Sequence, residues 1–205
     1  MEKLGIRLIG DIHGSDPMLN KIISTQSRHD LTIQIGDFGI GFGAENALKR
    51  MDPNKVKVLA GNHDDYNKLA QYEHNLGRYG VFEFKGKKIF FVCGAWSIDW
   101  MHRTPGKSWW STEELSLDES NDCLDLWQLV AREIDIVITH DGPQEVTKNI
   151  LGRWPYDTLT GSVFTEMLKI RRPPRWYFGH WHVGYSETIN NTNFRCIDID
   201  EELLI

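Results

Sequence analysis

Short apolar runs alternate with polar clusters along most of the chain, which is the pattern of buried strands that end in turns. Five of these runs are followed within a few residues by Gly, Asp, Asn or His: 6–9, 31–35, 56–59, 134–138 and 176–178. Because the same residue types follow each run, we expect five strands whose carboxyl ends deliver polar side chains to one edge of the molecule.

Helical patterns lie between these strands. One helix is expected to begin at Pro17, behind a cap at Ser15 or Asp16. Ser116 and Glu119 have the spacing of a capping box at the start of a second helix. The apolar faces of this helix and of a later one are marked by two sets of residues: Leu124, Trp127 and Val130, then Val163, Met167 and Ile170. Alternating strands and helices predict an α/β layered domain.

A second group of strand-like segments has little helix between its members: 81–84, 89–93, 185–189 and 194–199. Strands joined by short connections are typically antiparallel. We therefore expect two packed mixed sheets flanked by helices rather than one open parallel sheet. The chain shows no internal repeat, linker or low-complexity tract, which predicts a single domain over residues 1–205.

Apolar runs and cysteines limit the class of protein. The longest apolar run, 89–98, is far shorter than the ~20 residues that cross a bilayer. Arg7 and Asp11 interrupt the amino-terminal run, so it does not have the form of a signal peptide. The three cysteines, Cys93, Cys123 and Cys196, form no C-x-x-C pair, which is typical of a reducing compartment. These features predict a cytoplasmic protein without membrane contact.

The formal net charge is −6, and the longest basic clusters, 85–88 and 171–175, are more typical of solvated turns than of binding sites. Binding a polyanion requires clustered Lys and Arg. Nucleic acid is therefore disfavoured as the main partner, although a basic groove assembled from separate segments is left open. The acidic run 198–202 is expected to be a solvated strand end, and His29 and His74 are expected to be exposed.

Metal-ligand side chains gather at the predicted strand ends. Five of the eight histidines follow strand-like runs, together with two aspartates and one asparagine: His13, His63, His140, His180, His182, Asp11, Asp37 and Asn62. Imidazole, carboxylate and amide donors without thiolate favour Mn, Fe, Zn or Ni over structural zinc or calcium. So many donors exceed one tetrahedral ion but fit two ions bridged by a carboxylate, which is the arrangement of a dinuclear hydrolytic centre.

Five sequence blocks occur in order along nearly the whole chain: Asp11-x-His13, Gly36-Asp37, Gly61-Asn62-His63-Asp64, His140 and Gly179-His180-x-His182. Together they resemble the signature of the calcineurin-like metallophosphoesterase superfamily. The resemblance implies a four-layer α/β/β/α sandwich, with the site at the edges of the two sheets.

The same resemblance implies a role for each residue of these blocks. Three residues would hold each of two metal ions: Asp11, His13 and His182 for the first, and Asn62, His140 and His180 for the second. Asp37 would bridge the two ions. His63 would not be a ligand, but would donate a proton to the leaving oxygen or stabilise the transition state.

Two positions depart from patterns seen in the superfamily. Many members carry an acid or amide three residues after the bridging aspartate, where it orients the catalytic histidine, but this chain has Ile40. Either Asp64 or Asp65 replaces that group, or His63 is held less firmly. Protein serine/threonine phosphatases carry Arg immediately before the Gly-Asn-His block, where this chain has Ala60, and this difference counts against that branch.

Four of the eight tryptophans lie within residues 94–114: Trp96, Trp100, Trp109 and Trp110. A Pro-Gly pair favours a loop here, and the segment resembles one in small bacterial and phage-encoded members of the superfamily. As a lid over the metals it would pair Arg103 or Lys107 with a phosphate oxygen and stack a tryptophan on a base or sugar, with Trp181 at the same mouth. Core packing and a dimer contact are the alternatives for the tryptophans. His102 is expected at the surface.

The leading hypothesis is an enzyme that uses two divalent metal ions, with Mn favoured over Fe, Zn or Ni. Its substrate would be a small phosphomonoester or phosphodiester, of which a nucleotide is the favoured type. His63, Asp37 and Arg103 are the candidate catalytic residues. A nuclease or a phosphoprotein phosphatase is the alternative among enzymes, and a metal-binding interaction scaffold is the alternative outside them. The oligomeric state is left open.

Overall fold

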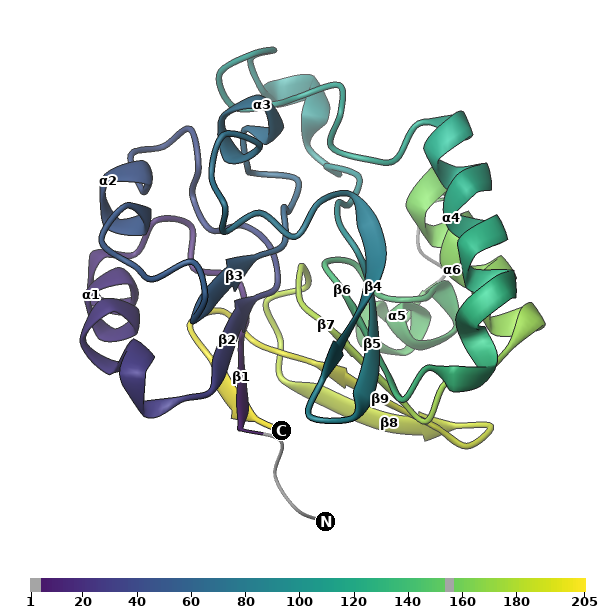
Figure 1. Ribbon diagram of the computed structural model, residues 1–205. Coiled ribbons are helices and arrows are strands. Elements are labelled where there is room, and N and C mark those ends of the chain that lie inside the picture. The colour runs from purple at the N-terminus through teal and green to yellow at the C-terminus, as the bar shows by residue number, and fades with distance from the viewer. Residues whose placement is uncertain (1–4, 154–156) are drawn as a thin grey trace.

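Two β-sheets pack face to face, and helices cover their outer faces, in the computed structural model of the chain (Figure 1). The structure describes residues 5–153 and 157–205. Within these residues the smaller sheet has the strand order β10-β1-β2-β3, and the larger sheet has the order β4-β5-β6-β7-β9-β8. The predicted four-layer α/β/β/α sandwich of two mixed sheets is confirmed.

The strands that carry the predicted chemistry are parallel within each sheet. In the smaller sheet, β1 (Ile6–Ile9), β2 (Leu31–Gln34) and β3 (Val56–Val58) are parallel, and β10 (Glu202–Leu204) pairs antiparallel with β1. In the larger sheet the four inner strands are parallel: β5 (Lys87–Val92), β6 (Ile136–Thr139), β7 (Arg175–Phe178) and β9 (Thr192–Cys196). The edge strands of the larger sheet are antiparallel to their neighbours: β4 (Tyr79–Phe84) and β8 (Tyr185–Ile189).

Helices lie on both outer faces of the sandwich (Figure 1). Beside the smaller sheet are α1 (Asp16–Thr25) and the short α2 (Glu45–Leu48), and α3 (Tyr66–Leu69) follows β3. The larger sheet is covered by α4 (Leu117–Val130), α5 (Gln144–Leu151) and α6 (Leu159–Ile170). Single 3₁₀ turns occur at Gln26–Arg28, Trp100–His102 and Ala131–Glu133.

The predicted capping box forms at the start of α4. The backbone N–H of Glu119 donates to Ser116 Oγ at 3.2 Å, and the backbone N–H of Ser116 donates to the Glu119 carboxylate at 2.8 Å. These bonds satisfy two donors that a helix start leaves free. The buried face of α4 carries Trp127, whose indole N–H donates to the Met167 carbonyl of α6 at 2.9 Å. The two helices are therefore fixed to each other as well as to the sheet.

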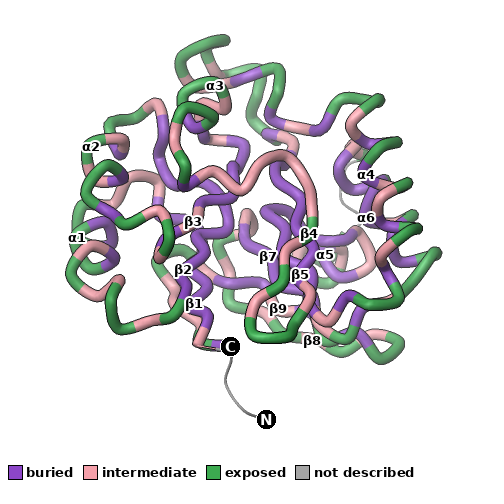
Figure 2. The backbone as a smooth tube through the Cα atoms, in the orientation of Figure 1, coloured by how far each residue is buried: buried purple, intermediate pink, exposed green. Residues whose placement is uncertain are grey.

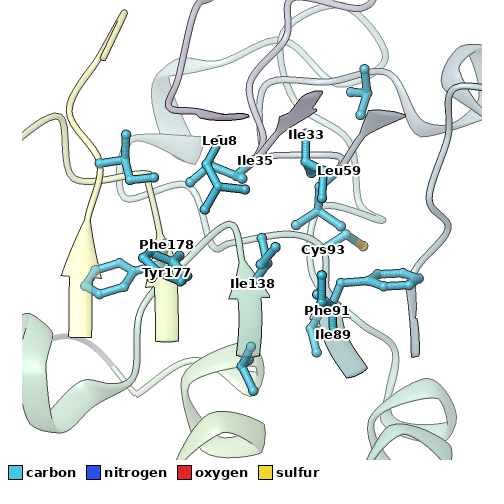
Figure 3. Packing of buried hydrophobic residues seen from close by; sticks show 14 of the residues in the cluster. Leu8, Ile33, Ile35, Leu59, Ile89, Phe91, Cys93, Ile138, Tyr177 and Phe178 are labelled. Carbon is cyan, nitrogen blue, oxygen red and sulfur yellow. The ribbon is translucent and has the colours of Figure 1, made fainter. Parts of the chain in front are cut away.

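The hydrophobic core lies between the two sheets, where the tube in Figure 2 is mostly buried. In Figure 3, Leu8 and Ile33 from the smaller sheet lie across from Ile138 and Phe178 of the larger sheet. All four side chains are fully buried, and each such side chain contributes roughly 1.5–3 kcal/mol by leaving water. The closely packed interior gives the loops at the strand ends a rigid support.

The acidic run 198–202 is a solvent-accessible strand end, as expected: it follows β9, none of its residues is buried, and its last residue, Glu202, begins β10. Two other local predictions were wrong. Ile170 is 45% exposed, since the buried face of α6 turns through Phe164 and Leu168 instead. His74 is buried rather than exposed, and its Nε2 lies 3.2 Å from the Met51 carbonyl oxygen.

The three cysteines are all buried and form no disulfide. Among the helices of residues 5–153 and 157–205, none has the length and apolar character that crossing a membrane requires.

Candidate metal centre

The predicted ligands meet at one edge of the sandwich, where parallel strands of both sheets end. Two loops of the smaller sheet supply the carboxylates, because Asp11 follows β1 and Asp37 follows β2. The remaining side chains follow β1, β3, β6 and β7: His13, Asn62, His63, His140, His180 and His182. Strands far apart in the sequence thus place their first polar residues side by side, as expected at the carboxyl ends of parallel strands.

One group of donors consists of Asp11, His13, Asp37 and His182, whose ligand atoms all lie within 4.8 Å of one another. His182 Nε2 is 3.0 Å from Asp11 Oδ2 and 3.0 Å from His13 Nε2. His13 Nε2 in turn is 3.8 Å from Asp37 Oδ2. Two imidazoles and two carboxylates that converge on one point form a donor set suited to a transition-metal ion.

A second group of donors lies on the other side of Asp37. Asn62 Oδ1 is 3.1 Å from His140 Nε2 and 3.1 Å from His180 Nδ1. His140 Nδ1 lies 3.0 Å from the Ile35 carbonyl oxygen, which can only accept, so Nδ1 carries the proton and Nε2 faces the group. A backbone partner of this kind commonly fixes the tautomer of a metal-binding histidine.

Asp37 lies between the two groups with one oxygen toward each. Its Oδ2 faces His13, and its Oδ1 lies 3.5 Å from His140 Nε2 and accepts the His63 backbone N–H at 2.8 Å. Burial opposes ionisation of Asp37, but the neighbouring His140, His63 and His13 hold its pKa well below the ordinary value. Asp37 is therefore an ionised carboxylate that lies between the two donor groups.

The backbone of this edge is strained at candidate ligands. His13, Asp37, His180 and His182 have left-handed φ values of 44°, 57°, 68° and 49°, a conformation that costs roughly 1–3 kcal/mol for a residue with a side chain. Gly61 shows how tight the packing is, because a Cβ there would lie 2.2 Å from Asp37 Oδ1. Strain concentrated at residues of one site is typical of a functional constraint.

Asp64 ties the loop after β2 to the loop after β3. Its buried carboxylate accepts four backbone N–H groups at 2.9–3.1 Å, from Phe38, Gly39, Ile40 and Gly61. Burial and the charge of Asp37 raise the pKa of Asp64 to about 6, although these hydrogen bonds oppose the shift. Asp64 is thus a structural clamp that holds the loops of Asp37 and Asn62 together.

Asp64→Asn is expected to lower the free energy of unfolding by at least ~2 kcal/mol, because an amide has one acceptor atom and its NH₂ group would face backbone donors. The matched control is Asp65→Asn. The Asp65 carboxylate caps α3 by accepting the Lys68 N–H, which asparagine does equally well, and its 3.5 Å ion pair with the exposed Lys68 side chain contributes little. Urea unfolding would measure the free energy of unfolding of both variants, and an unchanged m value would show that the two curves can be compared. Equal stabilities for the two variants would contradict the clamp.

His63 stands over the metal-ligand groups and contacts Arg103. Its ring packs edge-on against His13, with centroids 4.9 Å apart. Arg103 Nη1 lies 2.9 Å from His63 Nδ1, Arg103 Nη2 lies 2.7 Å from Nε2, and Arg103 Nε donates to Asp99 Oδ1 at 2.6 Å. Burial lowers the pKa of His63, and the charges of Arg103 and His13 lower it further, although Asp37 opposes them.

Neither aspartate considered as the partner of His63 occupies that position. The Asp64 carboxylate accepts backbone N–H groups of the two loops, and the Asp65 carboxylate caps α3. Ile40 has a buried side chain, as its apolar character suggests. Arg103, which comes from a loop forty residues later in the chain, lies within 3 Å of both ring nitrogens of His63 instead.

The tryptophan-rich segment, residues 94–114, forms one wall of a pocket over these residues. The pocket has a volume of about 350 Å³ and is lined by Asp37, Asn62, His63, Ile98, Asp99, Arg103, His180, Trp181 and His182. Arg103 thus reaches the site, whereas Lys107 is exposed and lies outside this lining. Trp181 lines the pocket as predicted, with its indole N–H donating to Asp141 Oδ1 at 2.9 Å.

The tryptophans of this segment divide between packing and exposure. Trp110 is buried and packs edge-on against Phe42, with ring centroids 5.7 Å apart. Trp100 is 43% exposed, and its neighbour Met101 is 72% exposed. His102 is exposed, as expected. Core packing therefore accounts for Trp110, and Trp96 and Trp109 are half-buried. Trp100 is accessible, next in the chain to the pocket residue Asp99, and its ring centroid lies 6.2 Å from that of Trp109.

Two buried residues of the same segment were not identified from the sequence. Ser97 Oγ accepts a hydrogen bond from Asn62 Nδ2 at 2.9 Å, and Ser97 bonds to the carboxylate of Glu113. One signal for Ser97 was present, because it follows β5 just as other site residues follow their strands. Glu113 has no such signal, since no strand leads into it.

The donors fit a pair of divalent cations. Four imidazole nitrogens, two carboxylates and one amide oxygen converge in two groups that share Asp37. Imidazole nitrogens together with carboxylate and amide oxygens at one edge of the sheets are the donors of a transition-metal site rather than of a calcium site.

Comparisons with known proteins identify the fold and the family. A family model described as calcineurin-like phosphoesterase matches residues 5–184. A solved dimetal phosphatase from Danio rerio is 12% identical, with a TM-score of 0.62, and the match covers 97% of this chain and 88% of that one. A hypothetical protein from Thermus thermophilus is 15% identical, with a TM-score of 0.52, over 95% of this chain and 76% of that one.

A putative 5′-nucleotidase from Staphylococcus aureus is 12% identical, with a TM-score of 0.60, and the match covers 95% of this chain. It covers 48% of the nucleotidase, so the present chain spans about half of that protein's length. No curated protein sequence matches the chain. At these identities the solved structures show the shared fold, and the family model, which spans most of the chain, identifies the family. The chain belongs to the calcineurin-like phosphoesterases, a family of hydrolases that cleave phosphoric esters with divalent metal ions.

Proposed function

We propose that this phosphoesterase hydrolyses a small phosphomonoester or phosphodiester of nucleotide type in the pocket over the two donor groups. The observation that carries the proposal is the pocket itself, because His63 and Arg103 line it together with four of the candidate metal ligands: Asp37, Asn62, His180 and His182. A volume of about 350 Å³ fits a small molecule rather than a folded protein substrate.

The two donor groups support an assignment of the metal ligands. In this proposal one ion is held by Asp11, His13 and His182, the other by Asn62, His140 and His180, and Asp37 is shared. Mn²⁺ is the favoured ion, with Fe, Zn and Ni as alternatives for the same donors. When bound, such a pair of ions activates water and neutralises the charge of the phosphoryl group.

His63 and Arg103 provide the remaining functions. His63 donates a hydrogen bond or a proton to the oxygen of the leaving group, a role worth about 10²–10⁴ in rate. Arg103 binds a phosphate oxygen and also holds the ring of His63, since its guanidinium lies against the ring, can donate to the unprotonated ring nitrogen, and is itself held by Asp99. Trp181 and Ile98 give the same pocket apolar walls that suit a base or a sugar.

The test of the proposal is the hydrolysis of a generic aryl phosphodiester and of the matching monoester with added Mn²⁺, against metal-stripped protein. Diester preference would point to cyclic nucleotides or nucleic acids, and monoester preference to nucleotide or protein monophosphates. If a panel that also includes nucleoside pyrophosphates gave no metal-dependent activity, the proposal would fail and the protein would be a metal-binding scaffold.

Arg103→Ala is expected to lower kcat/KM by about 10–100-fold without changing the metal content, because a charge-assisted hydrogen bond contributes roughly 1.5–3 kcal/mol. Lys107→Ala is the matched control, since Lys107 lies on the same segment but is exposed and outside the pocket lining. Steady-state kinetics on the best ester and metal analysis of both variants would decide. If Arg103→Ala kept the parental kcat/KM, Arg103 would have no part in the reaction.

A further inference from the structure

A chain of three buried side chains leads from the tryptophan-rich segment to one of the candidate ligands. Asn62 is 2% exposed, Ser97 is 1% exposed and Glu113 is 3% exposed. Glu113 Oε1 accepts the Ser97 backbone N–H at 2.9 Å, and Glu113 Oε2 accepts the Ser97 hydroxyl at 2.6 Å. The other side of the Ser97 hydroxyl oxygen accepts a hydrogen bond from Asn62 Nδ2 at 2.9 Å.

The Glu113 carboxylate determines which atom donates and which accepts in each of these hydrogen bonds. An ionised carboxylate has acceptors only, so the single hydroxyl hydrogen of Ser97 points to Glu113. The Ser97 oxygen can then only accept from Asn62, which requires the NH₂ group of the amide on that side. The opposite atom, Asn62 Oδ1, is left facing His140 Nε2 and His180 Nδ1.

We infer that Glu113 is a positioning residue: acting through Ser97, it fixes the orientation of the Asn62 amide so that oxygen, not nitrogen, faces the second metal site. An amide turned by 180° would present N–H donors, which cannot bind a cation. The inference rests on the proposed assignment of Asn62 as a ligand. It adds two residues, Ser97 and Glu113, that neither touch the substrate nor bind the metal.

Glu113→Gln is the sharpest test because it keeps the shape and reverses one hydrogen bond. Glutamine has a single acceptor oxygen, and the Ser97 backbone N–H requires it. Its NH₂ group then donates to Ser97 Oγ, so the Ser97 hydrogen loses Glu113 as its acceptor. When that hydrogen turns toward Asn62, it favours the amide orientation whose oxygen faces Ser97 rather than the metal site. Loss of an outer hydrogen-bond partner of this kind typically weakens metal affinity by about 10–100-fold.

The measurement is titration of metal-stripped protein with Mn²⁺ at pH 8, by calorimetry and by the EPR signal of free Mn²⁺. Wild type is expected to bind two ions, and Glu113→Gln is expected to bind the first normally and the second about 10–100-fold more weakly. Glu114→Gln is the matched control, because that neighbouring carboxylate accepts the Thr160 N–H, a bond that glutamine preserves. Its two affinities should equal those of the parent.

A second variant separates positioning from folding. Ser97→Ala removes the hydroxyl and should weaken the binding of the same, second Mn²⁺ ion. Since Glu113 acts through that hydroxyl, the double variant should bind Mn²⁺ no more weakly than Ser97→Ala. Thermal unfolding of the metal-stripped variants reports any structural loss separately. Additive losses in the double variant, or two unchanged Mn²⁺ affinities in Glu113→Gln, would overturn the inference.

Because these titrations contain no ester, they are independent of the proposed activity. If wild type bound two Mn²⁺ ions but hydrolysed no ester, the proposed function would fail while the role of Glu113 could still be confirmed. If wild type hydrolysed esters and Glu113→Gln bound Mn²⁺ normally, only the role of Glu113 would fail.

Discussion

His63→Ala is expected to lower kcat by about 10²–10⁴-fold and to leave the number of bound metal ions unchanged. The imidazole lies over the donor groups without belonging to either of them, and it lines the pocket beside Arg103. Removing it takes away a hydrogen-bond or proton donor to the leaving oxygen but no metal ligand. Steady-state kinetics and metal analysis of the same preparation test both parts of this prediction.

Esters with different leaving groups distinguish the two possible roles of His63, which are proton donation and stabilisation of charge. If His63 donates a proton, the loss in kcat should be large for an alkyl ester and small for an activated aryl ester, whose oxygen departs without protonation. An equal loss for both esters would favour a role in stabilising charge. His102→Ala is the matched control, because His102 is an exposed histidine of the neighbouring segment and should show parental kinetics. Loss of metal in His63→Ala would contradict its place outside the ligand set.

Asp37→Asn is expected to weaken the binding of both metal ions by more than ~100-fold. That value is the upper end of the loss caused by removing a hydrogen-bond partner of a metal ligand. Asp37 is shared by the two donor groups, and its two oxygens face His13 and His140. An amide offers one oxygen and no charge, so it cannot serve both sites equally. Turnover should fall with metal occupancy, and additional Mn²⁺ should restore it only in part.

Thermal unfolding measures the same effect without any substrate. A ligand that binds only the folded state at 100 times its Kd stabilises a protein by about 2.7 kcal/mol. Mn²⁺ should therefore raise the Tm of wild type, and this rise should be absent or much smaller in Asp37→Asn. Asp125→Asn, at an exposed aspartate of α4, is the control and should respond as wild type does. Two tightly bound ions and full activity in Asp37→Asn would exclude the bridge.

The Asp37→Asn variant also has an expected spectroscopic signature. Burial lowers the pKa of His140, but the Asp37 carboxylate overcomes this and raises the pKa to about 10. Replacement of the carboxylate removes that stabilisation of the imidazolium, so the pKa of His140 should fall. NMR titration of metal-stripped wild type and variant would report the shift, and an unchanged His140 pKa would mean that the two side chains do not interact.

The residues of the donor groups were predictable because one local rule places them. Each follows a short buried strand, and parallel strands of a packed sheet end at the same edge. Asp11, Asp37 and His140 obey this rule on three different strands. The pattern of apolar runs therefore sufficed to expect that these side chains lie together, and their chemical types sufficed to expect a metal site.

Pairing at the edges of the sheets was less predictable. Strand β10 was not expected from the sequence, because residues 202–204 show no clear alternation of apolar and polar positions. The free edge of β1 decided the outcome, because backbone groups on an unpaired strand favour pairing with any segment that reaches them. Such a partner is fixed by the path of the whole chain and not by the segment's own pattern.

The sequence by itself determined the two-sheet α/β class, the family blocks and the residue types of the centre, because these depend on short-range periodicity and on spacing after strands. Only the tertiary structure decided what surrounds them: Arg103 against His63, Asp64 as the clamp of two loops, and Glu113 behind Ser97 and Asn62. These contacts join residues up to 40 positions apart through irregular loops. Loop paths follow from the packing of the complete core, and no local pattern records them.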